Sequence, residues 1–321
     1  MKNCLTFMLL TFVCISCNAQ HIYKDLISTA DSLYKAKNYQ QSNETYIKAL
    51  QIEKNNKNDL YNAACAAALA QDTNHALDFL NLSIENGWNN LQHTETDGDL
   101  KSLHNTPKWT ELMAKLKNNL AKIEANYNKP VKEELEEIYT TDQGNRVKYI
   151  NAEKQFGFKH HSVDSLIKVM NHDDSINNLR VTKILDKFGW LGEDKIGNKG
   201  NLTLFLVIQH SDLNIQQKYL PMMRLAVKEG KAKASALALL EDRVALGEGR
   251  KQTYGSQIGT NGAEKRTYVL PLVDPDHVDE RRAAVGLGPL ADYVKQWGLV
   301  WDVEAYKKQL PEIEKWEKME H

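Results

Sequence analysis

The sequence of 321 residues predicts a mainly α-helical protein with one small β-hairpin. Three observations lead to this prediction. Over residues 22–126, apolar and small residues recur at helical spacing, and the first glycine is Gly87. The second half continues this periodicity between its glycines and prolines. Only residues 252–257 and 266–273 have the aromatic and β-branched composition of strands, and a glycine-containing turn, residues 258–262, joins them.

The composition and charge of the chain narrow the class of protein. Hydrophobic residues make up 42% of the sequence and charged residues 26%, which is ordinary for a folded globular protein and argues against global disorder. The 41 basic and 42 acidic residues leave a formal net charge of -1. A nucleic-acid-binding protein needs an excess of basic groups to neutralise phosphates, so we expect no nucleic-acid partner.

The N-terminus has the pattern of an export signal. Lys2 precedes an apolar segment, residues 4–15, that is too short to cross a bilayer. The small residue Ala19 suits cleavage by a signal peptidase. This interpretation predicts a signal peptide of residues 1–19 and a mature chain that is secreted in soluble form.

A second interpretation of the same segment is a lipoprotein signal. Residues 14–17 resemble a bacterial lipobox, in which cleavage after residue 16 leaves Cys17 to carry a lipid. Cys14 departs from the branched aliphatic residue that is usual at that position. A lipid on Cys17 would place the protein in the periplasm or at the outer membrane, attached to the bilayer only through its N-terminus.

The four cysteines predict neither a disulfide nor a cysteine metal site. Cys4, Cys14 and Cys17 lie in the export signal, which leaves Cys65 as the remaining thiol of the mature chain. Cys65 lies within the alanine-rich segment of residues 62–68, which predicts a closely packed helix. We expect a small buried thiol at this position and not a nucleophile.

Two segments of the first half repeat with a period of 34 residues. Their matching positions carry small residues on either side of a large one, which allows two helices to approach closely. The matching pairs are Ser42 and Ala76, Tyr46 and Leu80, and Ala49 and Ser83. This pattern resembles that of tetratricopeptide repeats, and residues 87–109 resemble the closing segment that follows short arrays of them. We therefore expect helical hairpins with a capping segment over residues 22–126.

The resemblance to tetratricopeptide repeats implies a role in protein interaction. Repeats of this kind usually hold a peptide or a partner protein in a concave groove. Two repeats form only a small groove, so an appendage that docks or stabilises the rest of the protein is an equal alternative.

A second domain is predicted from residue 130 to residue 321. Pro130 interrupts the preceding pattern and suits the first turn of a new helix. Gly192, Gly197 and Gly200 are interpreted as a loop. The helices predicted for this domain span residues 131–140, 145–155, 162–188, 202–209, 221–229, 232–246, 275–285, 290–297 and 303–317.

Several motifs of the second domain follow the order of those in a bacterial family. They are Asp142-Gln143 with Arg146, Gly189-Trp190, Gln209-His210 with Asp212, Asp242-Arg243, Tyr254-Gly255-Ser256-Gln257, and Asp274-Pro275 before Asp279-Glu280-Arg281-Arg282. On these residues, the region from about 131 to 297 resembles the domain of unknown function 6624. Leu191 departs from the proline that follows the Gly-Trp pair in that family. The resemblance implies no activity, so each residue is weighed by its chemistry.

Two predicted helices carry charged residues where the pattern indicates burial. Apolar side chains surround Asp242 and Arg243 on one helix, and Arg282 lies on the apolar stripe of another, with Arg281 beside it. Buried charges are costly unless they are paired and hydrogen-bonded. We expect either an internal Asp–Arg pair or a site carboxylate with an arginine clamp for an anion.

Four further residues are candidate ligand contacts. Tyr254 and Gln257 lie on either side of Gly255, whose conformational freedom predicts a bend in or beside a strand. Asp142 and Arg146 are expected just after a helix end, where helix capping and ligand binding are equal alternatives.

The stretch from Leu204 to Asp212 runs from five apolar residues into a polar end. A charged histidine is favourable near a helix C-terminus, and Asp212 is suited to begin the next helix. Gln209 and His210 are also well placed to contact the buried charges. In a catalytic interpretation His210 is the acid–base group, and Asp212 or Asp242 orients it.

These observations lead to two hypotheses. We favour an envelope-associated binding or scaffold protein, with repeats that engage a protein or peptide and a second domain with a polar ligand pocket. The alternative is a hydrolase-like enzyme in which Arg243, Arg282 and Gln257 hold an anionic group. The sequence contains no nucleophile elbow, zinc-protease motif or phosphate-binding loop. His172 and Asp173 lie in a segment with the polarity of an exposed turn, so we expect no metal and no cofactor.

Overall fold

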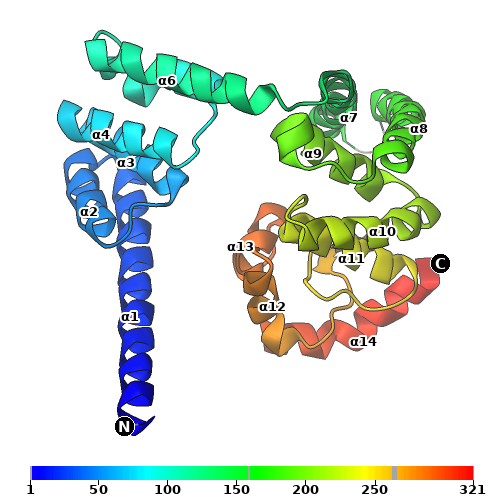
Figure 1. Cartoon of the computed structure of the whole chain (residues 1–321). Coiled ribbons are helices and arrows are strands. Elements are labelled where there is room, and N and C mark those ends of the chain that lie inside the picture. The colour runs from blue at the N-terminus through cyan, green and yellow to red at the C-terminus, as the bar shows by residue number, and fades with distance from the viewer. Residues whose placement is uncertain (1, 158–159, 262–265, 321) are drawn as a thin grey trace. The chain divides into compact units, whose positions relative to one another are not determined.

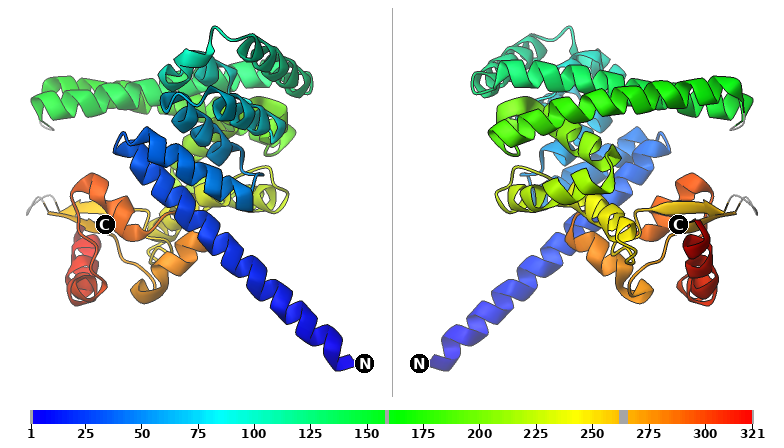
Figure 2. Two further views of the ribbon diagram at one scale, coloured as in Figure 1. Left: turned by 90° about the vertical axis from the view of Figure 1, so that its left-hand side faces the viewer. Right: turned by 90° about the vertical axis from the view of Figure 1, so that its right-hand side faces the viewer.

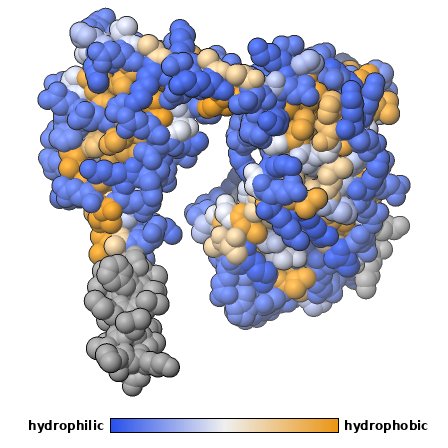
Figure 3. Space-filling view, viewed as in Figure 1, coloured by the Kyte–Doolittle hydropathy of each residue, from blue (hydrophilic) through white to orange (hydrophobic). Residues whose placement is uncertain are grey.

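The computed structural model describes residues 2–157, 160–261 and 266–320 and divides the chain into two compact units, Met1–Ala125 and Asn126–His321. Figure 1 shows that helices make up most of each unit. The prediction of a mainly α-helical fold is confirmed. On the face of each unit seen in Figure 3, hydrophilic residues predominate and hydrophobic residues gather in smaller patches.

The predicted export signal lies largely outside the described side chains. The backbone of helix α1 (Lys2–Lys35) runs through this signal, but side chains are described only from Ala19 onward. Lipidation of Cys17 therefore stays a prediction. Of the helices in the described part of the chain, none is both long enough and apolar enough to cross a membrane.

The N-terminal unit is built from paired helices, with α1 packed against α2 and α3 against α4. Helix starts are fixed by capping side chains: Asn56 accepts from the N–H of Asn58, and Asp72 accepts from that of His75. The elements after α1 are α2 (Tyr39–Ile52), α3 (Lys57–Leu69), α4 (Thr73–Glu85), α5 (Leu91–Thr96), the 3-10 helix η1 (Gly98–Leu103) and α6 (Pro107–Glu124).

The two hairpins repeat in their packing and in their turns. All six residues of the 34-residue pattern are buried. The turn residues Lys37 and Gln71, which are also 34 residues apart (71 minus 37), have φ angles of 60° and 63°. Ser42 donates its hydroxyl hydrogen to a backbone carbonyl of α1 at 2.8 Å, and Ser83 donates to one of α3 at 2.7 Å. Small side chains and these bonds bring the two helices of each hairpin into contact.

The C-terminal unit has two cores. The larger core joins α7 to α11, and the smaller one lies between the β-hairpin and α12 to α14. Figure 2 shows α7 and α8 as a long pair lying side by side. The elements are α7 (Lys129–Phe156), α8 (His161–Phe188), α9 (Glu193–His210), α10 (Leu213–Lys228), α11 (Ala234–Gly247), β1 (Ile258–Asn261), β2 (Arg266–Val269), η2 (Pro275–His277), α12 (Val278–Ala284), α13 (Leu290–Val294), η3 (Lys295–Trp297) and α14 (Val303–Glu320).

Helix α7 is continuous, and the predicted break between residues 140 and 145 is wrong. Leu135, Ile138 and Asp142 lie on a buried face of α7, which packs along α8. This packing outweighs the low helix propensity of Gly144 and its neighbours. Asp142 and Arg146 therefore lie in mid-helix and not after a helix end.

Helix α9 includes part of the predicted glycine loop. It begins at Glu193, and Gly197 is the residue inside it with non-helical geometry, with a φ of 69°. Gly200 lies within the helix, where an added Cβ would come within 3.1 Å of the Ile196 side chain. The glycines thus permit a kinked and closely packed helix start in place of a loop.

Helix α10 continues through Pro221, where the sequence predicts a helix start. The side chain of Asp212 caps α10, since its Oδ1 accepts from the N–H of Ile215 at 3.0 Å. Tyr219 and Met223, on either side of the proline, are buried in the core. This cap and this packing hold the helix together although Pro221 lacks an N–H donor.

The β-hairpin is displaced along the chain from its predicted position. Residues 252–257 form an irregular loop, and β1 instead uses residues 258–261 of the predicted turn, paired antiparallel with β2. Gly255 has a φ of 68°, and the N–H groups on either side of it donate to the carboxylate of Asp242. A buried side chain therefore takes the place of a strand partner.

Candidate functional site

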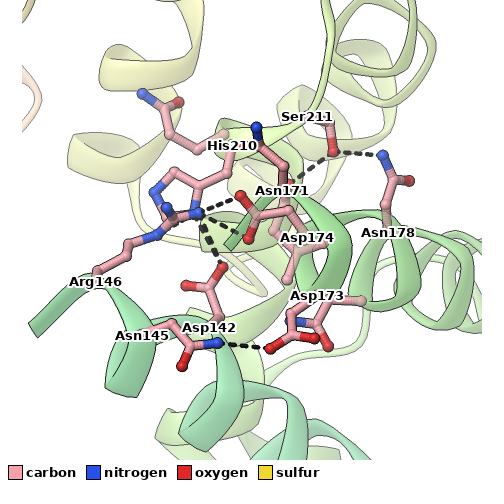
Figure 4. A network of polar contacts seen from close by, with 12 residues as sticks. Asp142, Asn145, Arg146, Asn171, Asp173, Asp174, Asn178, His210 and Ser211 are labelled. Atoms are coloured by element: carbon pink, nitrogen blue, oxygen red, sulfur yellow. Dashed lines mark hydrogen bonds and ion pairs between the residues drawn. The ribbon is translucent and has the colours of Figure 1, made fainter. Parts of the chain in front are cut away.

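Three helices bring four titratable side chains together at the C-terminal end of α9 (Figure 4). Asp142 and Arg146 are one turn apart on α7, Asp174 lies on α8, and His210 is the last residue of α9. Arg146 Nη2 donates to Asp142 Oδ1 at 3.2 Å and to the two oxygens of Asp174 at 3.0 and 3.1 Å. The guanidinium thus links carboxylates from two helices.

The His210 imidazole is held through one nitrogen. Its Nδ1 lies 3.2 Å from Asp142 Oδ1 and 3.2 Å from Arg146 Nε. A protonated Nδ1 donates to Asp142, whereas an unprotonated Nδ1 accepts from Arg146, so the two bonds alternate with the protonation of this nitrogen. Within the described residues, Nε2 has no hydrogen-bond partner, and it is the nitrogen left to contact a ligand.

The pKa values of the two carboxylates of the site are shifted in opposite directions. Burial by itself would raise the pKa of Asp142, which is 3% exposed, but the hydrogen bond and charge of His210 and the charge of Arg146 outweigh burial and lower it. At Asp174 burial outweighs the charge and hydrogen bond of Arg146, and the pKa is raised. As the pH falls, Asp174 therefore takes up a proton before Asp142.

We expect this order in a pH titration of the carboxyl carbons by NMR, with the midpoint of Asp174 above that of Asp142. The folded protein favours the ionised form of Asp142, so this group stabilises the fold at pH values above the ordinary aspartate pKa of about 3.9. That stabilisation is lost as the pH falls through the lowered pKa of the folded state. In Arg146→Gln both midpoints move up, since the Arg146 charge lowers both pKa values. A midpoint of Asp142 above that of Asp174 in the unmodified protein would contradict this geometry.

A small polar cavity of about 150 Å³ opens beside these residues. Asp142, Asp174 and His210 contribute to its wall, together with Asn177. The Asn177 side chain is 2% exposed, and its Nδ2 has no hydrogen-bond partner in the described part of the chain. A buried amide donor without a partner is costly, and an acceptor atom of a ligand would satisfy it.

A family model for the Family of unknown function (DUF6624) matches residues 129–306, which is more than half of the chain. The chain belongs to this family. The matched region of the chain contains the whole site of Asp142, Arg146, Asp174 and His210. No curated protein and no solved structure matches the chain.

Within the described residues of the DUF6624 region, Asp242 forms neither a hydrogen bond nor an ion pair with His210. Asp242 is fully buried, and its oxygens accept from the backbone N–H groups of Thr253 at 2.6 Å, Tyr254 at 3.0 Å and Ser256 at 3.0 Å. Both oxygens are used by this loop, so Asp242 is an anchor of residues 252–257 and does not orient the histidine. The carboxylate at hydrogen-bond distance from His210 is that of Asp142.

Arg281 and Arg282 hold the same loop of the DUF6624 region through carbonyl groups. Arg282, 2% exposed, donates to the carbonyl of Tyr254 at 2.7 Å and to that of Gly288 at 2.6 Å. Arg281 donates to the carbonyl of Thr253 at 3.0 Å. Each of these bonds is made to a backbone carbonyl, so the structure gives both arginines a structural position.

The remaining predicted residues have contacts of their own, which for Arg243 are with Gln209 and Gln257. Gln209 is buried, and its carbonyl accepts from Arg243 Nη1 at 3.0 Å. Arg243 Nε also donates to Gln257 Oε1 at 3.3 Å. Asp212 lines the polar cavity as well as capping α10, and Tyr254 is half-buried on the loop.

The sequence did not identify Asp174 and Asn177 as parts of the site. The segment around His172 and Asp173 has many polar residues, which favoured an exposed turn, but it lies inside the long helix α8. A helical spacing of three from Asp174 to Asn177 and four to Asn178 places these side chains along one face, and all three line the cavity. That spacing is the signal in the sequence that indicates their proximity.

The N-terminal unit has a larger cavity of about 590 Å³, formed mainly by α1, α3 and the α5–η1 segment. Burial and the neighbouring aspartates raise the pKa of each tyrosine in its wall, so these hydroxyls stay protonated and donate. The tyrosine–aspartate pairs are Tyr34 with Asp99, Tyr46 with Asp31, and Tyr61 with Asp97.

An aromatic wall completes this groove. Tyr61 and Trp88 are stacked with ring centroids 4.0 Å apart. One sulfur and two carboxylate oxygens, from Cys65, Asp97 and Asp99, lie within 4.8 Å of one another, as a metal site requires. Burial and the Asp97 charge raise the pKa of the Cys65 thiol, so the metal-free thiol stays protonated.

Proposed function

We propose that this protein is an exported binding protein whose N-terminal hairpins act as tetratricopeptide-type repeats and hold a basic segment of a partner protein. The single observation that carries this proposal is the groove of about 590 Å³ lined by α1, α3 and the α5–η1 segment. First helices of successive hairpins contribute most of its wall. A groove formed in this way accommodates an extended segment or a long side chain.

The chemistry of the groove favours a cation. Asp31, Asp97 and Asp99 supply three carboxylates to the lining. The basic residues of the lining are Lys35 and His93. The stacked Tyr61–Trp88 pair offers an aromatic face to a lysine or arginine side chain. The apolar stem of such a side chain packs on the rings, while its charged end reaches the carboxylates.

Selection of short random peptides displayed on phage, with the protein immobilised, tests this proposal. We expect the enriched peptides to share a lysine or arginine, and binding to fall in Asp97→Asn, which keeps the shape of the groove but removes one charge. Asp78→Asn, on the exposed face of α4, is the matched control and should bind as the unmodified protein does. Enrichment of acidic or neutral peptides, or of none, would sink the proposal.

A second candidate function is a hydrolase-like reaction at His210. The observation that favours it is the Asp142–His210 contact of 3.2 Å beside a polar cavity, with Nε2 left for a substrate or a water molecule. In this role Asp142 replaces Asp212 and Asp242 as the orienting carboxylate. Turnover of chromogenic esters or phosphoesters that disappears in His210→Asn would support this function over binding alone.

A further inference from the structure

A cavity in the C-terminal unit shares none of its lining residues with the polar site. It has a volume of about 840 Å³, which is within the usual range for small-molecule pockets. Residues of α10, α11, the loop after α11, the segment after β2, and α14 line it. Its apolar wall is formed by Leu213, Leu246, Leu270 and Pro271, of which the three leucines are half-buried.

Arg243 supplies a positive charge to this cavity. It is half-buried, and its hydrogen bonds go to two neutral acceptors, the Gln209 carbonyl and Gln257 Oε1. Within the described residues, Nη2 has no hydrogen-bond partner, and no carboxylate lies at ion-pair distance from the guanidinium. Burial lowers the pKa of Arg243, and the nearby Arg146 charge adds to this effect.

The other charged groups of the lining have partners. Lys251 pairs with Glu314 at 2.7 Å, and Arg250 pairs with Glu248. Of the three cations that line the cavity, Arg243 is thus the one without an acidic partner in the described part of the chain. A half-buried cation of this kind is stabilised by an anion that pairs with it in two parallel hydrogen bonds.

We propose that this cavity binds a small amphipathic carboxylate, such as a fatty acid. Its carboxylate pairs with Arg243, and its apolar chain lies against Leu213, Leu246 and Leu270. The leucines account for the apolar chain and the arginine for the charged end. This site does not depend on the proposed binding of a partner's basic segment, because the N-terminal groove and this cavity lie in different units of the chain.

Isothermal titration of the full chain with dodecanoate, dodecanol and acetate tests both parts of the ligand. We expect dodecanoate to bind at least about tenfold more tightly than dodecanol, since a charge-assisted hydrogen-bonded pair contributes that much or more. Acetate, which lacks the chain, should give no measurable binding at the same concentrations. Equal affinity for dodecanoate and dodecanol, or no binding of dodecanoate, would overturn the proposal.

Variants locate the site. Arg243→Gln should weaken dodecanoate binding by about tenfold or more, and Arg243→Lys should retain part of the affinity because it keeps the charge without the two-pronged geometry. Arg250→Gln, at an exposed lining position that is already paired, is the matched control and should bind normally.

A second variant keeps the test decisive if Arg243→Gln does not fold. Leu246→Glu places a negative charge on the cavity wall and should weaken dodecanoate more than dodecanol, because only the former is repelled. Thermal unfolding followed by circular dichroism establishes that each variant is folded. Unchanged dodecanoate binding in a folded Arg243→Gln or Leu246→Glu variant would place the ligand elsewhere.

Discussion

Asp242→Ala should lower the free energy of unfolding by about 3–5 kcal/mol, the range seen when a buried, fully bonded charge partner is removed. Asp242 is fully buried, and three backbone N–H groups, those of Thr253, Tyr254 and Ser256, donate to it. Without the carboxylate these amides lose their acceptor in an environment that water does not easily reach. Urea denaturation followed by circular dichroism measures the loss.

Two comparisons separate this anchor from a general effect of lost charge. Asp242→Asn keeps one oxygen acceptor and should cost less than Asp242→Ala. Glu241→Ala removes the neighbouring acid, which pairs with the exposed Arg224, and should cost at most about 1 kcal/mol. Hydrogen exchange in Asp242→Asn should be fastest at residues 253–256. Protected amides in this loop would show that Asp242 does not hold it.

Arg282→Met should cost about 2–4 kcal/mol, because the carbonyls of Tyr254 and Gly288 lose the donor that a buried guanidinium provides. Arg282 is 2% exposed, donates to Tyr254 and Gly288, and lies with its guanidinium 4.9 Å from the ring centroid of Tyr293. Methionine fills much of the same volume, so the loss reports the polar bonds more than a cavity. Thermal and urea unfolding measure it.

The same substitution at an exposed arginine serves as the control. Arg250→Met breaks a surface pair with Glu248 and should change stability by no more than about 1 kcal/mol. Arg282→Lys should recover only part of the loss, since a single ammonium group cannot reproduce the directions of two guanidinium bonds. A loss at Arg282 equal to that at Arg250 would contradict a structural role for the buried guanidinium.

Local periodicity predicted the helices well because most of them bury one face. The pattern around Asp242 leaves no polar side on its helix, and the residue is indeed fully buried. The 34-residue spacing likewise marks six buried positions. Where propensity and packing disagree, as at Gly144 and Pro221, packing decides, and the sequence alone does not show the neighbouring helix that provides it.

The partners of buried charges were harder to predict than their burial. Asp242 was expected to pair with an arginine or with His210, but it accepts from amides of a loop that lies eleven or more residues further along the chain. Arg146 and Asp174 meet because α7 and α8 pack side by side, which no local pattern contains. Such contacts depend on tertiary register, so sequence reasoning found Asp242 and Arg146 but neither Asp174 nor the pairing of these residues.

The central claim, that the N-terminal groove holds a basic side chain, is tested most directly by one calorimetric comparison. A lysine-containing peptide from the display selection is titrated beside the same peptide with norleucine, which has a similar stem and no charge. We predict at least about tenfold weaker binding of the norleucine peptide to the unmodified protein. That difference should largely disappear in Asp97→Asn. Equal affinities of the two peptides for the unmodified protein would contradict the account.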